Sequence, residues 1–124
     1  MTLRRLSMLQ WFGFLAGGIV WFTSFLAGAG TSQAACNPAG RRWGIPADTV
    51  QLALMVTALA LVLSAQVAAV AVFRATRNVE EQDPPPEGRL HFFSIGAMFG
   101  NTLFLMIIVL SEVATIVDRL CHQA

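Results

Sequence analysis

Three long runs of apolar residues divide the chain, at about residues 8–29, 49–73 and 90–117. Glu112, near the end of the third run, is the one Asp, Glu, Lys or Arg inside them. A helix needs about 20 apolar residues to cross the hydrocarbon core of a bilayer, where every backbone N–H and C=O must be hydrogen-bonded within the protein. The pattern therefore predicts an all-α membrane protein, with residues 1–124 forming a single domain of three transmembrane helices.

Composition and charge narrow the class of protein further. Apolar residues make up 56% of the chain and charged residues 12%, whereas about 25% are charged in a typical soluble protein. All eight basic residues are Arg and the net charge is only +1, so no basic surface suited to nucleic acid is expected. A water-soluble domain and a nucleic-acid partner are both disfavoured.

The first run has a competing interpretation as a secretory signal peptide. Arg4 and Arg5 precede it, and the small residues of "TSQAAC" before Cys36 offer a cleavage or lipobox-like site. However, the run is about 22 residues long, against roughly 7–15 in the apolar region of a signal peptide, and Gln33 stands where a lipobox needs an aliphatic residue. A retained transmembrane helix is the expected outcome.

The distribution of arginines predicts the orientation in the membrane. An N-terminus in the cytoplasm places five arginines inside and three outside, as the positive-inside rule favours. The loop at 29–48 and the tail at 118–124 are then periplasmic, and the loop at 74–89 is cytoplasmic. We therefore expect a multi-pass membrane protein with its N-terminus in the cytoplasm. The inside set is Arg4, Arg5, Arg74, Arg77 and Arg89, and the outside set is Arg41, Arg42 and Arg119.

The two loops differ in character. In the periplasmic loop, Asp48 and Gln51 are spaced as a capping box for the second helix. The cytoplasmic loop has four carboxylates and the run Pro84–Pro86, which cannot continue a helix; it is either a solvated connector or a docking site for a basic partner. The expected anchors at the membrane interface are Trp11, Arg41, Arg42 and Trp43.

Small and polar residues within the runs predict how the helices pack. Small residues allow backbones in a membrane to approach closely, and amides hydrogen-bond between helices. Gln66 and Asn101 are expected to lie at similar depth and to link the second and third helices. The expected small-residue contacts are Gly13 and Gly17 in the first helix, Ala60, Ser64 and Ala68 in the second, and Gly96 and Gly100 in the third.

Glu112 is the main candidate for function among the ionisable residues. An ionisable residue within a membrane span is a functional candidate by default. One interpretation is an interfacial glutamate paired with Arg119, or with Arg41 and Arg42; the other is a role in a proton path or in partner docking. Its position near the end of the third run favours the ion pair, and an ion conduit through Glu112 is the weaker alternative.

The two histidines do not suggest a cofactor. His91 and His122 are 31 positions apart in the sequence, so a helix between them would separate them by about 45 Å and they cannot ligate one haem. "DRLCH" has Asp118 in place of the first Cys of a haem-attachment motif. No cofactor is therefore expected.

Cys36 and Cys121 fall on the same, periplasmic side under the predicted orientation. An oxidising periplasm favours a disulfide between them, which would tie the first helix to the third. The alternative is that Cys36, Cys121 and His122 hold copper, because thiolates suit Cu(I). These three residues have no recognised metal-site spacing, so no metal is expected.

The segments "WFGFLAGGIVWFTSFLAGAG…AAC" and "GRLHFFSIGAMFGNTLFLMIIVLSEVATIVDRLC" resemble those of small bacterial three-helix inner-membrane proteins of uncharacterised function. Members of that group are often encoded beside haem–copper cytochrome oxidase genes. The triple-proline loop departs from the group, as does Gly18-Ile19-Val20, where members commonly have Pro-Leu-Ala after the glycine. The resemblance implies a location in the bacterial inner membrane and association with an electron-transport complex.

Together these features predict a non-catalytic accessory subunit that stabilises or assembles a respiratory or photosynthetic electron-transport complex. Three helices without an internal repeat or cofactor ligands bury too little to form a plausible enzyme or transporter alone. The expected partners are other membrane subunits and the lipid bilayer, with no small-molecule substrate. The alternative is a periplasmic copper or thiol assembly factor for a haem–copper oxidase.

Overall fold

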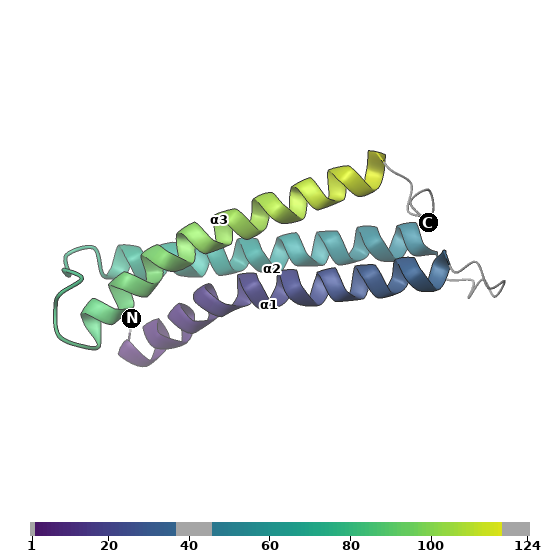
Figure 1. Ribbon diagram of the computed structural model, residues 1–124. Coiled ribbons are helices and arrows are strands. Elements are labelled where there is room, and N and C mark those ends of the chain that lie inside the picture. Colours follow the sequence, from purple (N-terminus) through teal and green to yellow (C-terminus); the bar gives the residue numbers. More distant parts are fainter. Residues whose placement is uncertain (1, 37–45, 118–124) are drawn as a thin grey trace.

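The computed structural model describes residues 2–36 and 46–117, apart from the side chain of Ala47. The described chain is almost entirely helical, with α1 at Leu3–Ala35, α2 at Ala47–Ala75 and α3 at Glu87–Val117. The three helices lie side by side, and α2 runs antiparallel to its two neighbours (Figure 1). All three are long and apolar enough to cross a membrane. The predicted all-α architecture of three such helices is confirmed.

The helices extend beyond the apolar runs that predicted them. α1 has 33 residues, so it is about 50 Å long at 1.5 Å per residue, well over the roughly 30 Å of hydrocarbon in a bilayer. The extra turns at its ends contain polar residues such as Arg4 and Ser32. Hydropathy marks only the part of a helix that contacts lipid chains, whereas the helix continues until a residue breaks it.

The start of α2 differs from the predicted capping box. Pro46 occupies the N-cap position and no side chain caps the helix there. Asp48 lies in the first turn, where a carboxylate interacts favourably with the helix dipole. The Gln51 side chain reaches α3 instead of the helix start, because it donates a hydrogen bond to Glu112. This residue therefore links helices, a role that its spacing from Asp48 did not predict.

Small side chains on α2 form the seam against which the other helices pack. Ala58, Val62, Ala65, Ala69 and Val72 follow one another at intervals of three or four residues and are all buried. By contrast, many large apolar side chains of all three helices point outward, as expected of surfaces that face lipid or another membrane protein.

The predicted small-residue contacts are only partly where we expected them. Ala68 is buried, but Ala60 and Ser64 are exposed. Ala60 and Ser64 each lie two positions beyond a buried residue of the seam, which is about 200° around the helix. Similarly, Gly96 is exposed and an added Cβ at Gly100 would meet nothing within 4 Å. The second glycine pair therefore does not bring helices together.

Gly13 and Gly17, in contrast, are the positions where α1 approaches both neighbours. An added Cβ at Gly13 would lie 3.2 Å from the backbone oxygen of Ala65 on α2. At Gly17 an added Cβ would overlap Asn101 Oδ1 and lie 3.1 Å from Phe104 Cδ2, both on α3. A methyl group at position 13 would require the α2 backbone to shift by a few tenths of an ångström, and one at position 17 would displace the Asn101 side chain.

Asn101 uses this close approach to hydrogen-bond α1. Its Nδ2 donates to the carbonyl oxygen of Gly13 at 2.8 Å, and the side chain is buried. Asn101 therefore does not bond Gln66 as predicted. Gln66 is half-buried, and its Oε1 has no hydrogen-bond partner among the described residues. The reason is geometric, since a glycine leaves its carbonyl open to a neighbouring helix.

Gly17→Ala is predicted to destabilise the bundle, whereas Gly100→Ala is not. The new methyl group at position 17 would displace the Asn101 amide, at a cost typical of overpacking, about 1–3 kcal/mol. Gly100→Ala meets open space, so the greater helix propensity of alanine should leave stability unchanged or raise it by up to about 1 kcal/mol. Reversible unfolding in mixed micelles measures both, and equal effects would contradict the packing described here.

Candidate functional site

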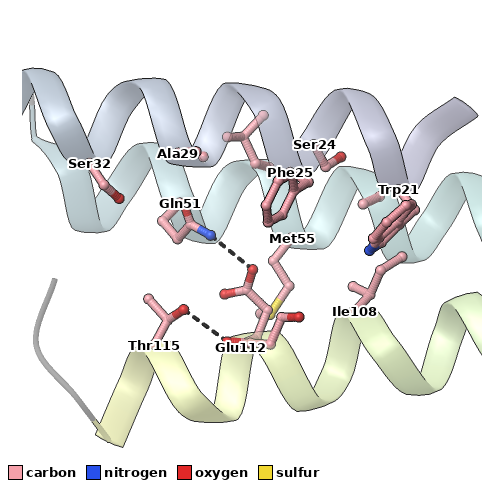
Figure 2. Close-up of a pocket in the computed structure, with 14 residues that line it drawn as sticks. Trp21, Ser24, Phe25, Ala29, Ser32, Gln51, Met55, Ile108, Glu112 and Thr115 are labelled. Atoms are coloured by element: carbon pink, nitrogen blue, oxygen red, sulfur yellow. Dashed lines mark hydrogen bonds between the residues drawn. The ribbon is translucent and has the colours of Figure 1, made fainter. Parts of the chain in front are cut away.

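A cavity of about 230 Å³ opens between the three helices (Figure 2), at the end of the bundle where α3 diverges from α1 and α2 (Figure 1). It lies toward the end of α1, the start of α2 and the end of α3. Its apolar walls include Trp21, Phe25, Leu54, Met55 and Ile108. Its polar lining comprises Ser24, Ser32, Gln51, Ser111, Glu112 and Thr115. This space, called the interhelical cavity below, is the candidate site.

A hydrogen bond from α2 to α3 crosses the interhelical cavity. Gln51 Nε2 donates to Glu112 Oε1 at 3.1 Å, and both side chains are half-buried (Figure 2). Gly28 of α1 makes this possible, because a Cβ there would lie 3.0 Å from Gln51 Oε1. All three helices thus contribute to the placement of Glu112.

Aromatic rings from α1 form one wall of the cavity. Trp21 and Phe25 stack with their ring centroids 6.0 Å apart and their planes 25° from parallel. Trp21 also contacts Phe104 of α3, at a centroid distance of 5.9 Å. These contacts hold the Trp21 ring between α1 and α3. The aromatic rings of this wall and the Glu112 carboxylate therefore line the same cavity (Figure 2).

Three serine hydroxyls in the cavity are available for further hydrogen bonds. In membrane helices a hydroxyl commonly bonds back to a carbonyl one turn earlier, as Thr57 does to Ala53 O at 2.8 Å and Thr115 does to Ser111 O at 2.8 Å. Within the described part of the chain, the hydroxyls lining this cavity that make no such bond are those of Ser24, Ser32 and Ser111.

The remaining predicted residues fall in several places. Trp11 is exposed on α1, with its ring 6.0 Å from that of Phe93. Cys36 follows α1 and is not a free thiol. The structure does not describe Arg41, Arg42, Trp43, Arg119, Cys121 or His122, so their predicted ion pairs, anchoring, disulfide and copper binding lie outside the described residues. Residues 2–36 and 46–117 contain no group of three His, Cys, Asp or Glu side chains that could hold a metal.

His91 lies at the opposite end of the bundle from the interhelical cavity. Its Nδ1 is 3.1 Å from Thr76 Oγ1, and its ring stacks on Phe73 at a centroid distance of 5.2 Å. Because the Thr76 hydroxyl donates to Val72 O at 2.9 Å, the contact is best made by an Nδ1–H donating to Thr76. His91 therefore joins the end of α2 to the start of α3.

Sequence reasoning missed two groups of polar residues. Gln10 is only 1% exposed, and neither atom of its amide has a hydrogen-bond partner among the described residues. It also missed the serines of the interhelical cavity, although Ser24, Gly28 and Ser32 recur every fourth residue on α1. A stripe of small and polar residues on an otherwise apolar helix was the signal that could have identified them.

The chain matches no protein-family model, no curated protein and no solved structure. What the cavity can do therefore follows from its own chemistry. One carboxylate, three serine hydroxyls and aromatic walls form a site that can bind a hydrogen-bond donor or a cation.

Gln51 and Glu112 are predicted to be energetically coupled. A double-mutant cycle with Gln51→Leu and Glu112→Met should give a coupling of about 1 kcal/mol, typical of hydrogen bonds between membrane helices. A second cycle with Gln51→Leu and Thr57→Val is the control, since Thr57 is exposed and bonds only Ala53 O; its coupling should be near zero. Unfolding in mixed micelles provides the four free energies of each cycle. Equal coupling in the two cycles would contradict the contact.

Cys36 and Cys121 remain the predicted disulfide pair. Thiol alkylation of the denatured protein should label neither cysteine until a reductant is added, and Cys36→Ser should expose Cys121 to labelling. Loss of the bond should lower stability by at most roughly 4 kcal/mol, because helices held in a membrane already restrict the unfolded chain. Labelling of both cysteines without reductant would show that the pair does not form.

Proposed function

We propose that this chain is a non-catalytic accessory subunit that packs against a larger membrane complex. The observation that carries the proposal is an aromatic cluster on the outer surface of α1 and α3, formed by Trp11, Phe14, Phe92 and Phe93. Phe93 contacts all three of the others, at centroid distances of 6.0 Å, 5.1 Å and 5.7 Å. Trp11, Phe14 and Phe92 are nevertheless exposed. Such rings, ordered by one another yet uncovered, offer a large contact area with little entropy left to lose on binding.

The acidic loop after α2 is a second exposed feature at the end of the bundle where α3 starts. The side chains of Glu80, Glu81 and Asp83 are exposed, and Asp83 Oδ2 accepts a hydrogen bond from Glu80 N at 2.9 Å. The loop leads into the start of α3, close to Phe92 and Phe93 in the sequence. A partner that covers the aromatic cluster and also has basic residues at the membrane surface would complement both features.

The class of complex comes from the sequence resemblance. Respiratory and photosynthetic electron-transport complexes are the proposed partners, because the first and third segments resemble proteins encoded beside haem–copper oxidase genes. The excess of arginines at the start of α1, at the end of α2 and around the acidic loop supports an N-terminus in the cytoplasm. In this orientation the aromatic cluster lies toward the cytoplasmic side and the interhelical cavity toward the periplasm.

Affinity capture from native membranes tests the proposal. A tagged chain solubilised in digitonin should co-purify with subunits of an oxidase or reaction centre in stoichiometric amounts. Hot-spot residues, among which Trp is enriched, each cost at least about 1 kcal/mol when truncated, so Trp11→Ala combined with Phe92→Ala should cost about 2 kcal/mol and weaken capture by roughly thirtyfold. Quantitative mass spectrometry of the captured subunits is the measurement.

The matched control replaces two exposed leucines of α2, Leu61→Ala and Leu63→Ala, which lie outside the aromatic cluster. Capture by this variant should equal that of the unmodified chain. Recovery of the unmodified chain alone would refute the accessory role, and equal loss in both double variants would refute the aromatic cluster as the contact.

A further inference from the structure

The polar part of the interhelical cavity, where Gln51 and Glu112 meet, lies close to one end of the bundle. Glu112 is five positions before Val117, the last residue of α3, or about 8 Å along the helix. Gln51 is likewise near the start of α2. Because the helices exceed the thickness of the hydrocarbon core, these terminal turns extend into the interfacial layer. A molecule entering the cavity from the side would meet the Glu112 carboxylate at headgroup level.

The carboxylate of Glu112 lacks a counter-charge in the described structure. Its one hydrogen bond is to the neutral amide of Gln51, and no cation in residues 2–36 or 46–117 forms an ion pair with it. A carboxylate in a partly buried, largely apolar space is stabilised by a cation, and its desolvation is otherwise costly. The site therefore favours a positively charged ligand and disfavours an anionic one.

The other walls match the remaining parts of such a ligand. Trp21 and Phe25 present ring faces, which attract ammonium groups. The hydroxyls of Ser24, Ser32 and Ser111 can donate to phosphate oxygens. Outside the cavity, exposed aliphatic residues of α2 such as Leu52 and Val56 offer a surface for acyl chains. Cation, anion and apolar chain thus each have a complementary group.

We propose that the interhelical cavity binds a phospholipid with an ammonium-bearing zwitterionic headgroup, held by Glu112 through the ammonium and by the serine hydroxyls through the phosphate. A primary ammonium, as in phosphatidylethanolamine, fits best because it can donate hydrogen bonds directly to the carboxylate. Phosphatidylglycerol has no cation to offset repulsion between its phosphate and Glu112. The inference does not depend on the proposed function, because it concerns a different end of the bundle and a different ligand.

Native mass spectrometry of the full chain in detergent micelles tests the inference. The protein is titrated with phosphatidylethanolamine, phosphatidylcholine and phosphatidylglycerol of identical acyl chains. We expect phosphatidylethanolamine to be retained several-fold more than phosphatidylglycerol, with phosphatidylcholine between them. Glu112→Gln should reduce this preference to near equality, while Glu87→Gln, at the far end of α3, should preserve it. Circular dichroism and thermal unfolding show whether each variant retains its helices.

Ser111→Leu provides a second variant, because it fills the cavity without removing the carboxylate. It should reduce retention of every lipid that binds there, whereas Glu112→Gln should change only the preference among lipids. Equal retention of the three lipids by the unmodified chain would overturn the proposal, as would an unchanged preference in Glu112→Gln.

The main competing occupant is an arginine of the chain itself. If Arg41, Arg42 or Arg119 fills the site, a preference for phosphatidylethanolamine will emerge only after these residues are replaced by glutamine, and that result also overturns the proposal. Co-purification with a larger complex is unaffected by any of these outcomes, so the two proposals fail separately.

Discussion

The structure depends on the close approach of α1 to its two neighbours at Gly13 and Gly17. In a bilayer no hydrophobic effect drives apolar helices together, so contact between backbones and interhelical hydrogen bonds must supply the association. Gly13 provides both, because its missing side chain admits the backbone of α2 and exposes its own carbonyl to Asn101 of α3. One glycine thus takes part in contacts with both other helices, about a third of the way along α1.

The cavity is a consequence of packing that is tight in one place and open in another. Near Gly17 a methyl group would overlap the Asn101 side chain of α3, yet toward the end of α3 the helices diverge (Figure 1). In the diverging part, a hydrogen bond between the long side chains of Gln51 and Glu112 links α2 to α3 in place of close backbone contact. A polar, open space at the end of a tightly packed bundle can hold a ligand without disturbing the contacts that maintain the fold.

The two proposed contacts use opposite ends of the bundle and different physical chemistry. The aromatic cluster of α1 and α3 offers apolar area with ordered side chains, which suits a protein surface. The interhelical cavity offers a carboxylate, hydroxyls and ring faces in a confined space, which suits a small charged headgroup. A lipid held at one end would keep α3 apart from α1 there while a protein partner covers the other end, so a small subunit can bind both at once.

The sequence by itself determined the number of helices and their approximate positions, because lipid imposes a minimum length and demands internally satisfied backbone groups. It also identified Gly13, Gly17 and Asn101 as packing residues, since glycines and amides stand out in an apolar run. Only the tertiary structure decided which side of each helix faces its neighbours. In a membrane helix both sides are apolar, so the pattern did not distinguish the exposed Ala60 and Ser64 from the buried seam of α2. The contact between Gln51 and Glu112, 61 positions apart in the sequence, likewise exists only because the folded helices bring their ends together.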